Sequence, residues 1–381
     1  MKKVVLFVLC CMMISGCAGL KNIQDLTYII AIGLDYDENK KEYIAYLQGL
    51  NFVNVAKQEG KSSANNIPNF IGSARGETLN LAVSKLYKLT DPPLFFGHIR
   101  TIVVTNRLTN SAMKKFLTEV GRNRSVRGTI RLFITEEKIE DVFQIQGLFN
   151  YPSVYTVLFK ESGAKIFKDE IQPVSLMQFL RTYYEPMGIA KLPAIKINHK
   201  AWKSEGSYPT VFIDGYSVFQ NSESKGMIGR KDAFIIDWIL GKNNSYTVRI
   251  EKDDKLIGVV DLGSPKMKVK YEKETDYPVF SIQLSVQGEL IEKIEHISYK
   301  DLLSKIEKEI TNQIYQVYEK GRKQGIDSLN VGENWYRKHP QKYHTLQNQP
   351  SFYLHKDSLK KIKVEVEVVN FNSYIYDKNT R

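Results

Sequence analysis

A cysteine near the start of the chain offers the most specific chemistry in the sequence. Cys17 follows Lys2 and Lys3, which make the N-terminus positive, and an apolar run over residues 4–14. This run is too short to cross a hydrocarbon core of roughly 30 Å as a helix. A charged start, a short apolar stretch and small residues before a cleavage point are typical of a secretory signal peptide. The pattern therefore predicts that residues 1–16 are removed and that the mature chain begins at Cys17.

The residues directly before the cysteine indicate what happens to its thiol. Ile14-Ser15-Gly16-Cys17 resembles a lipobox, in which the thiol receives diacylglycerol and the peptide is cut just before the cysteine. Two or more acyl chains, palmitate among them, hold a protein stably on a membrane, because each buried methylene contributes about 0.8 kcal/mol. The alternative is an ordinary signal peptide with incidental cysteines. We expect Cys17 to be the lipidation site, with residues 17–22 as a tether on the outer face of a membrane.

The remaining thiols lie in the segment that we expect to be removed. Two of the 3 cysteines, Cys10 and Cys11, fall within residues 1–16, and Cys17 is consumed by lipid. The mature chain then has no thiol pair to oxidise, even in a compartment that permits disulfides. This usage excludes cysteine catalysis, Fe–S clusters and thiolate zinc sites.

Histidines and carboxylates show no spacing that is specific for catalysis or metal binding. His339, His344 and His355 share one polar segment, but their spacing does not place two ligands on one helix face. Asp35 and Asp37 could be paired carboxylates, yet the glycine and final glutamate of an EF-hand loop are missing, so a hairpin turn is preferred. The glycines form neither a phosphate-binding loop nor a nucleophile elbow. We therefore expect no enzymatic activity, no cofactor and no metal ion.

Composition and charge describe a folded protein that lies near lipid. The chain has 381 residues, of which 43% are hydrophobic and 25% charged, so it can bury two or three domain cores. Its net charge of +12 becomes +10 when Lys2 and Lys3 are lost. Lysine and arginine are spread along the chain without a recognition motif, which argues against nucleic acid. Such charge suits anionic headgroups instead.

The first half of the chain alternates between strand and helix patterns. Apolar runs at residues 28–34 and 42–50 flank a turn-rich segment and predict a β-hairpin. Helical spacing follows over residues 79–87, and it ends before Asp91-Pro92-Pro93. Further patterns predict strands at residues 100–105 and 129–135, a short helix at 111–120, and a capped helix at 174–184. We expect residues 23–200 to form an N-terminal α/β region of one or two subdomains.

The second half resembles a sheet with one long helix across it. Residues 191–208 contain Pro193 and Gly206 and are predicted to be a loop-like boundary, followed by a C-terminal domain over residues 205–377. This domain has a predicted strand at 210–220, a helix ending at Gly241, and an antiparallel meander at 246–251, 256–261, 267–272 and 279–288. A helix with an apolar stripe from Leu303 to Gly321 and a closing strand with alternating valines follow. The predicted fold class is α+β, with mixed and antiparallel sheets, packed helices and two or three domains.

Several motifs, taken in order, resemble a known family. Ile32-Gly33-Leu34-Asp35, Phe96-Gly97-His98, Asp214-Gly215-Tyr216, Trp238-Ile239-Leu240-Gly241 and Gly325-Ile326-Asp327 are similar to those of the Ger(x)C family, the lipoprotein C subunit of spore germinant receptors. The resemblance covers nearly the whole mature chain. Two positions differ from the family pattern: Ala18-Gly19 replaces Trp-Asp after the cysteine, and Ser328-Leu329-Asn330 replaces a Phe-Gly pair.

The resemblance implies a function that involves no chemical reaction. It implies a subunit on the outer leaflet of the spore inner membrane that assembles with two membrane-embedded germinant receptor subunits. The subunit would be required for the germination response to nutrients. Only Cys17 takes over a chemical role from the family, while Gly33, Gly97 and Gly215 are expected to serve backbone geometry.

A lipid-anchored solute-binding protein of a transporter is the alternative function. Such proteins usually hold their ligand between two α/β lobes built on parallel sheets. The predicted antiparallel meander at residues 246–288 argues against this alternative.

Overall fold

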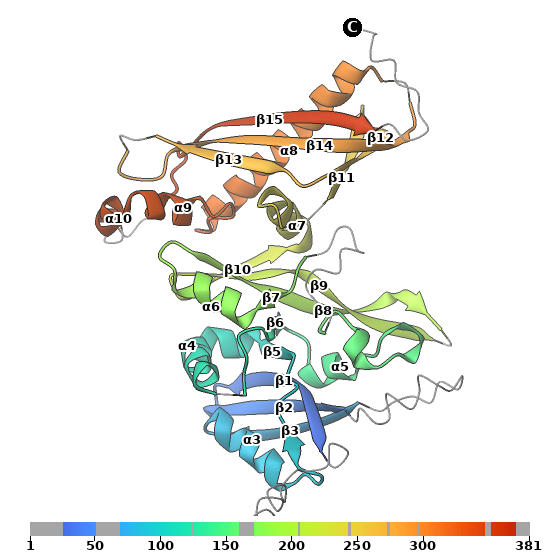
Figure 1. Cartoon of the computed structure of the whole chain (residues 1–381), viewed down its shortest axis with the longest axis vertical. Coiled ribbons are helices and arrows are strands. Elements are labelled where there is room, and N and C mark those ends of the chain that lie inside the picture. The colour runs from blue at the N-terminus through green and yellow to red at the C-terminus, as the bar shows by residue number, and fades with distance from the viewer. Residues whose placement is uncertain are drawn as a thin grey trace, which may run out of the picture.

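The computed structural model describes residues 26–50, 69–123, 125–159, 171–204, 206–242, 245–272, 275–295, 297–346 and 352–370. These residues form two β-sheets that follow one another along the longest axis of the molecule, with helix α7 (Arg230–Ile239) between them (Figure 1). The predicted α+β fold class is confirmed, including the smaller C-terminal sheet with its long helix. Within these ranges, no helix is both long and apolar enough to cross a membrane.

The larger sheet has parallel strands at its centre and antiparallel strands on both sides. Its main strands are β1 (Thr27–Asp37), β2 (Glu42–Leu50), β3 (Phe70–Gly76), β5 (Thr101–Thr105), β6 (Arg131–Thr135), β8 (Ile189–Lys203), β9 (Ser207–Gln220) and β10 (Glu223–Gly229). Their spatial order is β10-β9-β8-β6-β5-β1-β2-β3, and β1, β5, β6 and β8 run parallel. The short strands β4 (Leu94–Phe95) and β7 (Val174–Ser175) pair with β1 and β6. Every residue of β5 and β6 is buried, as expected for parallel strands covered on both faces.

Helices cover this sheet, and side-chain caps define where they begin. They are α3 (Leu79–Lys88), α4 (Asn106–Arg122), α5 (Ile139–Gln144) and α6 (Leu176–Tyr184), with short 3₁₀ turns at Leu148–Asn150 and Ser153–Tyr155. The Ser175 hydroxyl and the Gln178 side chain form a capping box, which is the cap expected for the helix predicted at residues 174–184. Helix α4 begins five residues before the predicted start, because Thr105 both ends β5 and caps α4 without an intervening loop.

Residues 191–208, which we expected to be loop-like, form a strand pair instead. Strand β8 pairs with β6 in parallel and with β9 in antiparallel register over most of its length. The register shifts between Pro193 and Ile195, which accommodates the proline that suggested a loop. The prediction was wrong because it gave Pro193 and Gly206 more weight than the apolar run around them. Strand β8 ends at Lys203 and β9 begins at Ser207 in the same sheet. The domain limits at 23–200 and 205–377 stay predictions.

The smaller sheet contains the predicted C-terminal strands, but their order differs from that of the predicted meander. Its strands are β11 (Tyr246–Lys252), β12 (Lys255–Leu262), β13 (Lys266–Tyr271), β14 (Phe280–Lys293) and β15 (Leu359–Asn370). Both β12 and β13 pair with β14, and the closing strand β15 pairs with β14 in parallel. The length of β14 explains this arrangement, because one of its edges holds β13 near its start and β12 near its end.

Helix α8 (Tyr299–Lys323) crosses one face of the smaller sheet (Figure 1). It buries Ile306, Ile310 and Ile314, which contribute to one core with the buried residues of β14 and β15. In β15, Val364, Val366 and Val368 are buried while the residues between them are exposed, as their alternation predicts. The short helices α9 (Val331–Lys338) and α10 (Pro340–Leu346) follow α8 in the chain.

Candidate functional site

The surface around Thr27 is the candidate functional site, because the predicted tether enters the fold there. The predicted lipidation site Cys17, the signal peptide at residues 1–16 and the tether at 17–22 all lie outside the described residues. Strand β1 begins at Thr27, whose backbone N–H donates to the Pro93 carbonyl (3.0 Å) and whose hydroxyl donates to the Pro92 carbonyl (3.0 Å). These bonds fasten the start of β1 to the segment between α3 and β4.

Large apolar side chains are exposed on the elements around Thr27. Leu89, Phe70 and Phe95 have 83%, 60% and 38% of their surface exposed, and we name these three residues the anchor-side patch. Phe95 pairs with the residue after Thr27, Leu89 lies three residues before Pro92, and Phe70 pairs with Gly49, which lies against the Thr27 methyl group. Exposed apolar surface is typical of contacts with lipid or protein, which makes these three residues the candidate contact surface.

His98 and the Phe96-Gly97-His98 motif shape this patch. A Cβ atom on Gly97 would lie 2.6 Å from the Phe95 ring, so only glycine allows the ring to fold back there. The His98 ring packs 5.2 Å from the Tyr28 ring and 5.7 Å from the Phe95 ring, measured between centroids. Phe96-Gly97-His98 therefore has a structural role at the end of the sheet where the chain enters.

The two carboxylates of the first hairpin make separate contacts. Asp35 is 2% exposed and accepts from both Nε (3.1 Å) and Nη2 of Arg107, which ties the end of β1 to the start of α4. This bond raises the pKa of Arg107. Asp37 instead pairs with Arg75 (2.9 Å) and accepts from the Lys40 N–H, which lowers the pKa of Asp37. Asp37 therefore stabilises the hairpin turn that was preferred from the sequence, whereas Asp35 joins β1 to α4.

The three histidines of the C-terminal segment also lie apart. The His339 ring packs against Trp335, His344 against Tyr343, and His355 against Tyr277. Among the residues that the structure describes, no three His, Cys, Asp or Glu side chains are placed to hold a metal ion.

A buried polar network joins the two sheets. Asp327 is fully buried and caps α9, accepting from the N–H groups of Val331 (3.1 Å) and Gly332 (2.6 Å). The Tyr353 hydroxyl donates to Asp327 (3.0 Å) and accepts from the Gln220 amide (2.8 Å) at the end of β9. Burial raises the pKa of Asp327 despite these donors. The motif Gly325-Ile326-Asp327 gave no sign that Asp327 would be linked through Tyr353 to Gln220 of β9, more than 100 residues earlier in the chain.

A second buried cluster was missed by sequence reasoning. Lys191 of β8, Tyr216 of β9 and Asp237 of α7 are all less than 10% exposed, and the Tyr216 hydroxyl donates to Asp237 Oδ2. Lys191 Nζ lies 3.8 Å from Asp237 Oδ1. A lone lysine inside the apolar run at residues 189–195 was the available signal. The neighbouring Gly215 is required by geometry, because a Cβ there would lie 2.1 Å from the Ile228 carbonyl.

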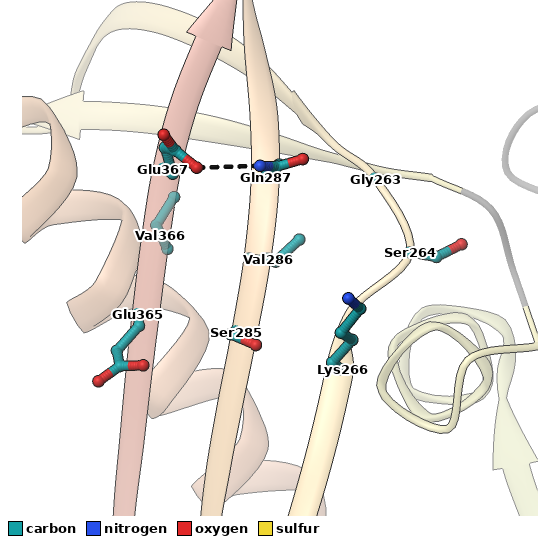
Figure 2. A pocket seen from close by; sticks show the side chains of 9 residues that line it. All are labelled: Gly263, Ser264, Lys266, Ser285, Val286, Gln287, Glu365, Val366 and Glu367. Carbon is teal, nitrogen blue, oxygen red and sulfur yellow. Dashed lines mark hydrogen bonds between the residues drawn. The ribbon is translucent and has the colours of Figure 1, made fainter.

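The face of the smaller sheet opposite α8 is polar and slightly hollow. A depression of 460 Å³ lies over β13, β14 and β15, lined by Lys266, Glu365 and Glu367 among others (Figure 2). The Gln287 amide donates to Glu367 (2.9 Å) across the two parallel strands. The lining offers both charges and hydrogen-bonding groups.

Profiles of two protein families match the chain. The one described as "Spore germination protein N-terminal domain" matches residues 19–197. The one described as "Spore germination B3/GerAC like, C-terminal" matches residues 214–372. The two matches together cover nearly all of the described residues.

Similar proteins come from spore-forming bacteria. Spore germination protein KC of Bacillus subtilis is 25% identical over 373 residues, which cover 90% of this chain and 89% of that protein. Spore germination protein GerQC of Bacillus cereus is 20% identical over 319 residues, 82% of this chain and 83% of that protein. The crystal structure of the GerBC protein aligns with a TM-score of 0.55 at 16% identity, covering 92% of this chain and all of that one, which shows a shared fold.

Proposed function

Because this chain belongs to the spore germination B3/GerAC-like family, we propose that it is a lipid-anchored, non-enzymatic subunit of a spore germinant receptor. The observation that carries the proposal is the pair of family matches over residues 19–197 and 214–372, preceded by the lipobox-like Ser15-Gly16-Cys17. The subunit lies on the outer leaflet of the spore inner membrane and acts by assembling with membrane-embedded receptor subunits. The solute-binding alternative finds no support in the relatives named above, which are spore germination proteins.

The position of the anchor-side patch supports a lipid-facing orientation. Thr27 lies ten positions after Cys17, and an extended chain spans at most about 3.6 Å per residue, so Thr27 lies within roughly 36 Å of the anchored cysteine. Leu89, Phe70 and Phe95 expose apolar surface at this same end. The last turn of α3 adds Lys85 and Lys88, which suit anionic headgroups. In the proposed orientation the patch rests on the bilayer.

Anchoring explains how a subunit with modest interfaces assembles with its partners. A lipid anchor confines the protein to the plane in which the membrane-embedded subunits lie, which raises its effective concentration beside them. The proposed function therefore needs no single strong contact with a partner.

The test removes the predicted thioether. In the spore-forming host, Cys17→Ala is expected to prevent lipidation, and the response to nutrients through this receptor is expected to fall strongly. Mass spectrometry of the N-terminal peptide checks the modification, and fractionation checks the location. The matched control is Cys11→Ala, which replaces a thiol within the segment that is removed and should leave lipidation and germination unchanged. An unmodified N-terminus in the wild-type protein, or normal germination with Cys17→Ala, would overturn the proposal.

A further inference from the structure

A cavity of 320 Å³ lies between α6 and α7, beside the strands that join the larger sheet to α7. Lys191, Tyr216 and Asp237 line it from the sheet and from α7, while Arg181 of α6 and Lys242, just after α7, contribute side chains that are exposed to solvent. Its volume is within the range of small-molecule sites, about 300–1,000 Å³. The cavity is separate from the anchor-side patch and is not used by the function proposed above.

Two buried polar atoms of the residues that line this cavity lack hydrogen-bond partners. Lys191 Nζ and Asp237 Oδ1 are both buried, lie 3.8 Å apart, and form no hydrogen bond within the described part of the chain. Lys191 also faces the ring of Tyr216, at 5.5 Å from its centroid. An ammonium group has three N–H donors, and a buried donor or acceptor left unbonded costs about 1–3 kcal/mol. One oxygen-bearing ligand with a neighbouring donor would satisfy both atoms.

The charges around the cavity favour an anionic ligand. The lining contains three cationic residues, Lys191, Arg181 and Lys242, and one carboxylate, Asp237, so cations outnumber anions by three to one. Burial and the nearby Lys242 lower the pKa of Lys191 to about 7, which is the result of confining like charges in a poorly solvated site. An anion in the cavity would stabilise the charged form of Lys191.

We propose that this cavity binds a small anion whose carboxylate or phosphate oxygens accept hydrogen bonds from Lys191 and Arg181, and whose neighbouring hydroxyl, ammonium or P–OH group donates one to Asp237. Hydroxy- or amino-carboxylates and monobasic phosphates have this chemistry. The Tyr216 hydroxyl donates to Asp237 Oδ2, so Oδ1 is the oxygen that would accept the ligand's hydrogen bond. Because α7 leads from the larger sheet to the smaller one, the ligand would lie at the junction between them.

The test uses pairs of anions that differ in their hydrogen-bond donor. The full chain in detergent is titrated calorimetrically at pH 6.5 and constant ionic strength with glycolate or acetate, and with phosphate or sulfate. Glycolate and phosphate are expected to bind saturably. Acetate and sulfate, which lack the donor to Asp237, are expected to bind about tenfold more weakly, the effect of one charge-assisted hydrogen bond. The carboxylate arm and the phosphate arm also show which anion the cavity prefers.

Variants separate binding at this cavity from general effects of charge. Arg181→Gln changes an exposed residue at the mouth and is expected to weaken binding about tenfold, while the exposed Lys231→Gln on the same helix as Asp237 should leave it unchanged. Lys191→Met is expected to abolish binding, and its unfolding temperature is measured in parallel because it alters a buried pair. Saturable binding of none of the four anions, or equal losses with Arg181→Gln and Lys231→Gln, would overturn the proposal.

Discussion

Two clusters of buried polar residues lie where the larger sheet meets α7 and the helices after α8. Lys191 and Asp237 face one another there, and Asp327 with Tyr353 and Gln220 forms the second network. A buried charge is stabilising only when its partners are well placed, and removing one partner leaves the other buried and unpaired. Single substitutions of these residues should therefore lower the free energy of unfolding measurably.

The dependence of stability on pH tests the protonation of Lys191. Burial and Lys242 lower its pKa from 10.5 to about 7, while Asp237 and Asp327 oppose that shift, and Tyr216 faces the same group. Between pH 7 and 9 the unfolded chain holds the Lys191 proton and the folded chain releases it, so this group makes the free energy of unfolding rise with pH. In Lys191→Met that contribution should vanish.

Urea unfolding of wild type and Lys191→Met at pH 7 and pH 9 measures the difference. The increase between the two pH values is expected to be smaller in the variant. An equal increase in both proteins would mean that Lys191 keeps its proton throughout this range.

At the scale of elements, α8 and β15 show how an amphipathic pattern becomes a core. Ile310 is 1% exposed on α8, and its neighbours in the core come from β14 and β15. The opposite side of the helix carries charges. The apolar stripe therefore determines which side of the helix packs on the sheet. The stability of the smaller sheet should depend on this stripe.

Truncation of the stripe should destabilise the protein. Ile310→Ala is expected to lower the free energy of unfolding by about 2–5 kcal/mol, because it removes transfer free energy and leaves a cavity. Lys308→Ala, at an exposed position two residues away, should change it by less than about 0.5 kcal/mol. Urea unfolding monitored by circular dichroism checks both, and similar effects of the two substitutions would contradict the burial of this stripe.

The loop between α3 and β4 provides a test of the proposed orientation on lipid. Leu89→Trp places a fluorophore on the anchor-side patch, and its emission should be quenched in vesicles that contain brominated acyl chains. Val369→Trp is the matched control, since Val369 is 47% exposed on the smaller sheet. Both signals are measured relative to the parent protein, which has 3 Trp. Equal quenching at the two positions, or none at Leu89→Trp, would contradict a bilayer contact by the patch.

At the scale of the whole molecule, contacts across the junction hold the two sheets together. Besides the Gln220–Tyr353–Asp327 network, Arg337 of α9 pairs with Glu185 (3.1 Å) at the end of α6. Met187, Trp335 and Leu346 form a small apolar cluster between the same parts. Such a junction of polar and apolar contacts should make the sheets unfold together.

Removal of one hydroxyl tests this coupling. Tyr353→Phe leaves the Gln220 amide without its acceptor and takes one donor from buried Asp327, so the free energy of unfolding should fall by about 1–3 kcal/mol. Tyr315→Phe, at a side chain that is 53% exposed, is the control and should be neutral. Two separate transitions in urea for the wild-type protein would show that the sheets unfold independently.

Local patterns in the sequence were sufficient for most of the elements. The hairpin of β1 and β2, the capping box at Ser175, the stripe of α8 and the alternation in β15 were predicted because each depends on residues a few positions apart. The family resemblance, which rests on short motifs in a fixed order along the chain, was also confirmed. The lipidation of Cys17 stays a prediction, because that residue lies outside the described part of the chain.

Long-range pairing was decided only by the tertiary structure. Strand β8 was predicted to be a loop because Pro193 lacks a backbone N–H and interrupts a strand pattern. In the structure, β6 and β9 provide the hydrogen-bond partners of the β8 backbone. Residues from distant segments also come together at three other places: the parallel pairing of β15 with β14, the cavity at Lys191 and the patch around Thr27. A sequence pattern reports which face of an element is apolar, whereas the partner of that face is selected by packing the whole chain at once.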